Sequence, residues 1–180
     1  MSQNRPNLQI KIDTLNLVYK LNPKLKDVVL RFLFVFNIFE SEFFEEKNDK
    51  CVSERIEDIE NFCNEKHLLL DELKSFHSHF KTIYIDNKDG KERFDTLCEF
   101  LGNKKKEYLK YFLEHTLDDK KNKEHSLKNA LTLSYRFRNN LYHGTKDLTY
   151  LGDYKDDFEV ITKFLKELMK HLDNNNAESV

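Results

Sequence analysis

The sequence predicts an all-α protein, an up-and-down bundle of five to seven helices. Four Gly and two Pro among 180 residues leave few interruptions to helical structure. The chain is 39% hydrophobic and 34% charged, as expected where helices bury one face and expose the other. With 15 Phe and no Trp, its core should consist mainly of Phe and Leu. A chain of this length predicts one domain with a substantial core.

We expect that domain to span residues 22–172, with an N-terminal arm at 1–21 and a flexible polar tail at 173–180. In the arm, Leu8 and Ile10 alternate with polar residues, a weak strand pattern. A single strand has no partner of its own, so this arm should pack on the bundle or on another chain.

The first helix should begin at Asn22-Pro23, a capping residue followed by Pro at the first helical position, and run to about Lys47. It is apolar on nearly all sides, which predicts a central position and a contact with a second subunit. Asn37 and Glu40 are polar points within this aromatic run. Its main stripe consists of Val28, Phe32, Val35, Phe36, Phe39 and Phe43.

Further helices follow from apolar spacing and from turn residues between them. They are expected from Ser53 through Cys63, over about 69–85, around Phe94–Leu101, after Gly102-Asn103 through Leu113, over about 124–142 and over about 156–172, with a loop at 86–90 and a solvated charged turn at 118–123.

Charge and cysteine content restrict the class of function. The net charge of −2 gives no general basic field for nucleic acid, so nucleic-acid binding requires a local basic surface. The segment 104–111, with three Lys in a row and two Tyr, is either such a surface or a solvated helix face.

The three cysteines form no CxxC pair, which favours a reducing compartment, and no apolar run is long enough to span a bilayer. We therefore expect a soluble cytoplasmic protein without a membrane partner. Cys63 and His67 have the spacing of half a zinc site but lack a second pair, so neither a metal nor another cofactor is expected. His77 and His79 should be surface residues.

The segment 136–146 concentrates polar side chains at the end of a predicted helix. At 100° per residue, Arg138 falls within the apolar stripe formed by Leu127, Ala130, Leu131, Ser134, Phe137 and Leu141. A guanidinium in that position is unfavourable unless it is paired and hydrogen-bonded or lines a wet cleft. We predict Glu40 of the first helix as its partner.

His143 stands where this helix should stop, because Gly144 is the expected left-handed cap. The negative end of the helix dipole favours its imidazolium form. Asn139, four residues earlier, shares its face and can hydrogen-bond the ring or a bound oxyanion. Alternatively, Arg138 extends to solvent, Asn140 and His143 cap the helix, and nothing reacts.

The run Arg138-Asn139-Asn140-Leu141-Tyr142-His143 resembles the signature of the HEPN superfamily (higher eukaryotes and prokaryotes nucleotide-binding), in its bacterial defence and toxin form. That signature is an Arg, four to six residues beginning with a polar one, and a His, late in a helical bundle. The motif covers about ten residues here, and the predicted architecture extends the resemblance over roughly 22–172.

The resemblance implies a metal-independent endoribonuclease, a toxin or antiviral effector, whose dimer brings two motifs to one cleft. Arg138, Asn139 and His143 would be catalytic, although Arg136 also satisfies the spacing. The supporting residues would be Arg136, Asn140, Tyr142, Lys146, Glu40 and Asn37. Its expected partners are RNA, a second copy of the chain and an antitoxin or defence protein. Some family members bind nucleotides or act as dimerising partners, so the alternative function is a non-catalytic HEPN-type module that binds a nucleotide, RNA or a protein partner.

Overall fold

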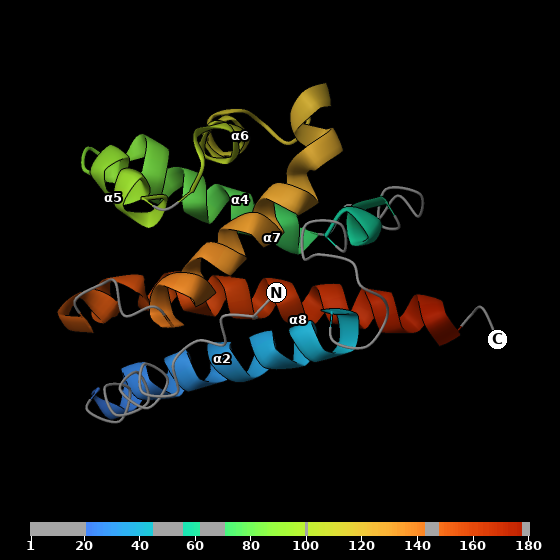
Figure 1. The fold of residues 1–180 in the computed structure, drawn as a ribbon, viewed down its shortest axis with the longest axis horizontal. Helices are drawn as coiled ribbons and strands as arrows, with labels where there is room; N and C mark the ends of the chain where they lie inside the picture. The colour runs from blue at the N-terminus through green and yellow to red at the C-terminus, as the bar shows by residue number, and fades with distance from the viewer. Residues whose placement is uncertain (1–20, 45–55, 62–70, 100, 143–147, 178–180) are drawn as a thin grey trace, which may run out of the picture.

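The computed structural model describes residues 21–44, 56–61, 71–99, 101–142 and 148–177. These residues are helical apart from short connections and contain no strand, which confirms the all-α prediction (Figure 1). Residues 56–61 form a short helix. The other elements are α2 (Pro23–Phe44), α4 (Asp71–Lys81), the π-helical turn η1 (Thr82–Asp86), α5 (Gly90–Leu97), α6 (Asn103–Glu114), α7 (Lys120–Tyr142), the 3-10 segment η2 (Leu148–Tyr154) and α8 (Lys155–Ala177). The expected arm at 1–20 lies outside this description.

The helices form two layers joined by α7. In Figure 1, α2 and α8 lie side by side and run in the same direction, and they have the most extensive contact of any two elements. Helices α4, α5 and α6 form the other layer, which contacts α8 mainly through α4. Helix α7 crosses between the layers and packs against α4, α5 and α6. This position gives α7 one side in the core and another available for a site.

Helix α2 begins where the sequence predicts. Asn22 Oδ1 accepts a hydrogen bond from the Leu25 backbone N–H at 2.9 Å, which satisfies a donor at the helix start. However, α2 lies at one margin of the described fold and not at its centre (Figure 1). Three large apolar side chains four residues apart remain exposed on its outer side: Leu30, Phe34 and Ile38. Periodicity alone missed this, because it reports how apolar a face is and not what covers it.

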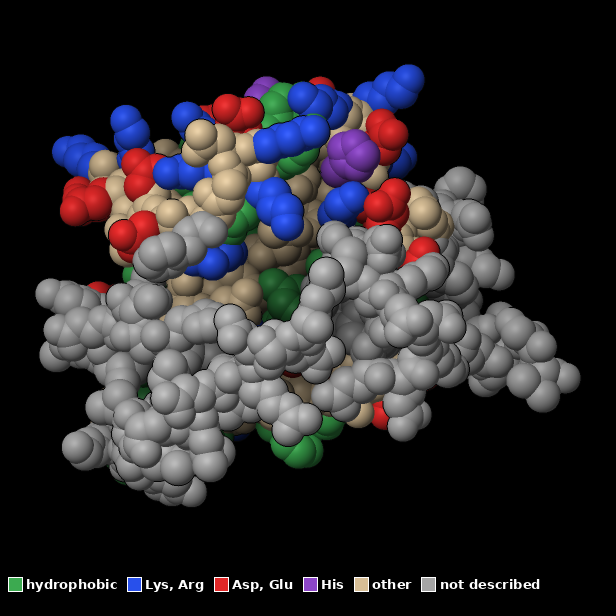
Figure 2. All heavy atoms as spheres, in the orientation of Figure 1, with side chains coloured by type: hydrophobic (Ala, Val, Ile, Leu, Met, Phe, Trp, Pro, Cys, Tyr) green, Lys and Arg blue, Asp and Glu red, His purple; other side chains and the backbone are tan. Residues whose placement is uncertain are grey.

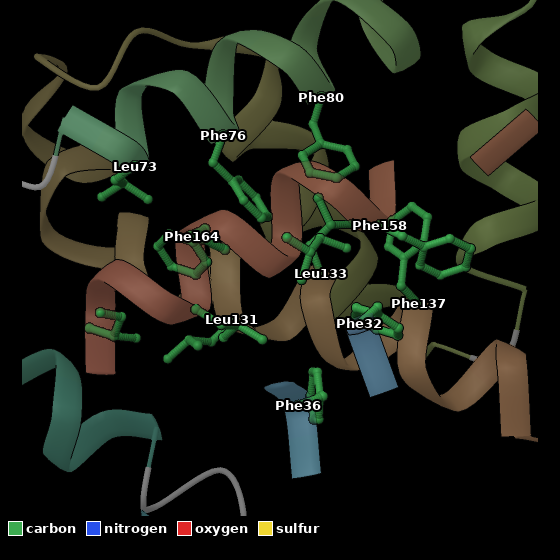
Figure 3. Close-up of a cluster of buried hydrophobic side chains, with 14 of the residues drawn as sticks. Phe32, Phe36, Leu73, Phe76, Phe80, Leu131, Leu133, Phe137, Phe158 and Phe164 are labelled. Atoms are coloured by element: carbon green, nitrogen blue, oxygen red, sulfur yellow. The ribbon is translucent and has the colours of Figure 1, made fainter. Parts of the chain in front are cut away.

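The core consists mainly of Phe and Leu side chains, as the composition predicts, and all the described helices contribute to it. Figure 3 shows Phe76 and Phe80 pointing from α4 towards α8 and α7. The rings of Phe76 and Phe164 lie 4.9 Å apart, and those of Phe80 and Phe137 lie 5.5 Å apart. Phe32 of α2 joins this cluster, 4.9 Å from the ring of Phe158. Such tilted aromatic pairs contribute on the order of 1 kcal/mol each beyond their buried area.

Helix α7 begins earlier than the sequence predicts, because two polar residues of the expected solvated turn close the end of α6. Asp119 Oδ1 accepts the Asn122 backbone N–H at 3.1 Å. The Asn122 side-chain amide donates to the carbonyls of Phe112, His115 and Thr116 at 2.9 to 3.1 Å. Asn122 is 1% exposed, so the expectation of a solvated turn is wrong at this residue.

The prediction that His77 and His79 lie on the surface is wrong for His77, and His79 is partly buried, with its side chain 21% exposed. His77 is buried and its Nε2–H donates to the Phe112 carbonyl at 2.7 Å; burial lowers the pKa of this imidazole. His79 Nε2 lies 2.8 Å from Oδ1 of Asp157, a buried carboxylate that also accepts a bond from the Tyr84 hydroxyl at 3.4 Å. Both histidines therefore connect α4 to its neighbours. Their sequence spacing does not reveal partners that come from α6 and α8.

At the C-terminal end, α8 continues to Ala177, beyond the predicted end near Leu172. Asp and Asn are weak helix formers, but residues 173–177 contain neither Gly nor Pro to stop the helix. Within the described segments, no helix combines the length and apolar character needed to cross a membrane.

Candidate nucleic-acid interface

A cleft of about 840 Å³ lies alongside α7. Residues of α7 form its floor, and residues near the start of α6 form one wall. Glu40 of α2 and Ile56 of the short helix complete the described lining. Arg138 and Asn139, two residues of the predicted motif, are among the residues that line it.

The two faces of α7 have different roles. The stripe predicted to face inward is buried, including Leu127, Ala130, Leu131 and Ser134. The cleft side has its own helical spacing of three and four residues, extending over two-thirds of the helix. It consists of His125, Lys128, Asn129, Thr132, Tyr135, Arg136 and Asn139. At 1.5 Å per residue this stripe is roughly 20 Å long, enough to follow an extended ligand.

Arg138 lies at the boundary between these faces and pairs with Glu40, as predicted. Its Nη2 donates to Glu40 Oε2 at 2.9 Å, and its Nη1 donates to the Asn139 side-chain oxygen at 3.1 Å. The two ion-paired side chains are 29% and 20% exposed, respectively. The carboxylate therefore stabilises the guanidinium in a partly buried position while leaving it accessible from the cleft.

Arg136 is bound differently, which bears on the choice between the two arginines. Its Nε donates to the Leu97 carbonyl at 3.0 Å and its Nη2 to the Asn140 side-chain oxygen at 2.7 Å. The Asn140 amide donates to the same Leu97 carbonyl at 3.2 Å. Together they bind the last residue of α5, a helix end whose carbonyls need partners. Burial lowers the pKa of Arg136, as expected for a guanidinium held against backbone groups.

The cleft is strongly basic although the chain carries a net charge of −2. Within the described part of its lining, five Lys or Arg side chains face one carboxylate, Glu40, which is bound by Arg138. The basic residues are Lys104, Lys105, Lys128, Arg136 and Arg138. Figure 2 shows Lys and Arg side chains gathered over the α6 and α7 region, beside a recessed surface. The described part of this cleft is therefore a local basic surface on a chain without a general basic field.

A buried carboxylate contacts the backbone of α7 at Lys128. Glu60, in the short helix 56–61, is 4% exposed, and its Oε1 accepts the Lys128 backbone N–H at 3.3 Å. Burial raises the pKa of Glu60 to about 7, and the Lys128 backbone hydrogen bond and positive charge only partly offset this shift. The group therefore changes charge near neutral pH, in contact with Lys128 of the cleft lining.

Some predicted site residues cannot be placed against this cleft. His143 and Lys146 lie outside the described residues, and Tyr142 is the last residue of α7, with its side chain likewise outside the description. Asn37 is exposed on α2, away from the cleft lining. Conversely, the motif did not indicate His125, Lys128, Asn129, Thr132 or Tyr135. These five residues recur at helical spacing in the sequence, but they lie on the face of α7 opposite the apolar stripe, and the motif did not include that face.

Metal-binding side chains do not come together in the described segments, where no group of three His, Cys, Asp or Glu has suitable geometry. Cys98 is buried, as expected of a small apolar side chain. Cys51, Cys63 and His67 belong to the segments not described. Comparison of the chain with family models, curated proteins and solved structures finds no match.

Proposed function

We propose that this chain is a metal-independent endoribonuclease of the HEPN type, a toxin or antiviral effector that acts as a homodimer. The main support is the placement of Arg138 in a basic cleft, paired with Glu40 and next to Asn139. An arginine beside carboxamide donors is suited to an anionic phosphodiester, because it offers charge and several directed hydrogen bonds.

The proposed reaction is transesterification followed by release of the RNA. The 2′-hydroxyl loses its proton and attacks the adjacent phosphorus, and the bond to the 5′-oxygen of the next nucleotide breaks. The leaving oxygen takes up a proton, so the products are a 2′,3′-cyclic phosphate and a 5′-hydroxyl. His143 would transfer protons in these steps, because imidazole titrates near neutral pH. Arg138 would stabilise the charge on the pentacoordinate phosphate, and Asn139 would orient it.

The supporting roles differ among the remaining residues. Glu40 would hold the Arg138 guanidinium in a fixed direction, so it is a positioning residue. Arg136 and Asn140 bind the end of α5 and would support the wall of the cleft. Tyr142 and Lys146 would contact a base or the backbone. A second copy of the chain would bring its own motif to the cleft, and an antitoxin or defence protein would control access.

The second candidate function is a non-catalytic HEPN-type module that binds RNA, a nucleotide or a protein partner through this cleft. The same basic lining favours it, because charge attracts an anionic ligand whether or not a reaction follows.

The test is cleavage of a mixed RNA substrate in excess EDTA by the wild type, His143→Ala and Arg138→Lys. We expect wild-type cleavage to leave cyclic phosphates, His143→Ala to lose it, and Arg138→Lys to lower the rate about 100-fold or more, because Lys lacks the planar guanidinium. Unfolding curves for all three proteins separate lost chemistry from lost stability. Cleavage that requires a divalent metal, or persists in His143→Ala, contradicts the mechanism. RNA binding without cleavage supports the second candidate.

A further inference from the structure

We infer that the α6 wall of the cleft binds single-stranded RNA, through phosphate contacts to Lys104 and Lys105 and stacking of an unpaired base on Tyr108. This inference rests on the proposed function in naming RNA as the ligand. Beyond the proposed function, the inference places an RNA-binding surface on α6, separate from the Arg138 motif. It also states that this surface prefers unpaired strands.

The side chains of α6 divide into two groups by their partners. Outside the cleft, Lys106 pairs with Asp95 at 2.8 Å and Lys110 pairs with Glu114 at 3.6 Å. Lys104 and Lys105 instead line the cleft, and within the described residues no carboxylate lies within ion-pair distance of either one. The basic run recognised in the sequence is therefore part solvated helix face and part cleft wall.

The two tyrosines of α6 divide in the same way. The hydroxyl of Tyr111 donates to Asp119 at 3.0 Å, and Lys121 lies 4.3 Å from the Tyr111 ring centre. Tyr108 is 43% exposed at the cleft wall, with Lys104 Nζ 6.0 Å from its ring centre. An exposed aromatic ring beside a lysine is suited to stacking a base while the cation contacts a phosphate.

Across the cleft, α7 continues the same pattern. Lys128, whose Nζ lies 3.6 Å from Glu57 Oε2, contributes a partly neutralised cation, and Asn129 and Thr132 contribute groups that can hydrogen-bond to sugars or phosphates. These three residues share one face of α7 and precede Arg138 along the helix. A strand lying between α6 and α7 would thus contact basic groups on both sides while it extends towards Arg138.

Concavity and stacking together favour an unpaired strand. In a duplex, both faces of a base are covered by its neighbours, so Tyr108 could not stack on it without unpairing. A-form duplexes are recognised mainly from outside, across their minor groove. A cleft with an exposed aromatic ring and basic residues on its walls is typical of proteins that bind single strands.

The test measures binding separately from cleavage. A fluorescent 2′-O-methyl oligonucleotide lacks the attacking hydroxyl, so binding to full-length protein can be followed by anisotropy without turnover. We expect the single strand to bind at least about tenfold more tightly than the same sequence in a duplex. The variants are Lys104→Glu/Lys105→Glu and Tyr108→Ala. The matched control is Lys88→Glu/Lys91→Glu, the same charge change outside this cleft.

We expect the α6 double variant to weaken binding about 100-fold and Tyr108→Ala about tenfold, with the control within about threefold of wild type. If the α6 double variant and its control weakened binding equally, the effect would be one of general charge and the inference would be overturned. It would also be overturned if the protein bound the duplex as tightly as the single strand, or bound an acidic protein more tightly than RNA. The proposed nuclease function can fail without this inference failing. If the protein binds the oligonucleotide as expected but does not cleave natural RNA, only the nuclease is refuted. If the α6 variants cleave RNA with the KM of the wild type, only the proposed binding surface is refuted.

Discussion

Arg138 on α7 and Glu40 on α2 form an ion pair across 98 positions of sequence, with Nη2 2.9 Å from Oε2. Both side chains are less than one-third exposed, so their attraction is screened less than that of a surface pair. This contact links the margin of the fold to the candidate site.

A double-mutant cycle of Glu40→Ala and Arg138→Ala should therefore give a coupling energy of about 1–2 kcal/mol in urea unfolding. The exposed pair Arg31–Asp27, whose side chains are 57% and 64% exposed, is the control. Its cycle should give at most about 0.5 kcal/mol. Equal coupling in the two cycles would show that partial burial adds nothing to the Glu40 interaction.

Arg136 should be needed for the fold more than for the chemistry. Arg136→Ala removes two hydrogen bonds, so we expect it to lower the free energy of unfolding by about 1–3 kcal/mol and to speed hydrogen exchange in α5. Asn140→Ala should have a smaller effect in the same region, and the double variant should be less than additive because both residues bind Leu97. If Arg136→Ala abolished cleavage while α5 exchanged as slowly as in wild type, Arg136 and not Arg138 would be the reacting arginine.

Glu60 should make stability fall as the pH rises towards neutrality. The folded-state pKa of Glu60 is about 7 against an ordinary value of 4.5, so the folded protein favours the protonated acid. The contribution of Glu60 to the free energy of unfolding is fully present below the ordinary pKa of 4.5 and is lost as the pH rises through about 7. Glu60→Gln keeps the acceptor for the Lys128 amide but cannot ionise. The free energy of unfolding of Glu60→Gln, compared with that of the wild type, should therefore rise by on the order of 1–3 kcal/mol from about pH 5 to pH 8. Urea unfolding at both values measures this, and parallel pH profiles would rule out Glu60 as the source.

Gly90 should not tolerate a side chain. A Cβ at this position would lie 2.6 Å from the Tyr84 carbonyl oxygen and 2.7 Å from its carbon, both backbone atoms that cannot move independently. Gly90→Ala should therefore lower the free energy of unfolding by about 2 kcal/mol or more. Gly152→Ala is the matched control, because a Cβ there meets nothing within 4 Å. It should leave stability unchanged or raise it by up to about 1 kcal/mol. Similar thermal unfolding for both variants would contradict the close approach at Gly90.

The fold and one contact of the candidate site could be predicted from sequence because they follow from local rules. Helical spacing predicted that the apolar stripe from Leu127 to Leu141 faces inward. A charged side chain on that stripe needs a partner, and Glu40 was predicted as the partner of Arg138. The contacts of Arg136, Asn122 and His77 could not be predicted in this way. Each binds a backbone carbonyl on another helix, and any residue can supply a carbonyl, so no sequence pattern marks it.

Helix α7 carries the basic cleft stripe on one side and the packed core on the other. Core side chains such as Leu131 and Phe137 hold this helix in place, so the positions along the stripe are set before any ligand arrives. In thermodynamic terms, the loss of conformational freedom on binding then falls mainly on the ligand strand, and little of it on the α7 backbone.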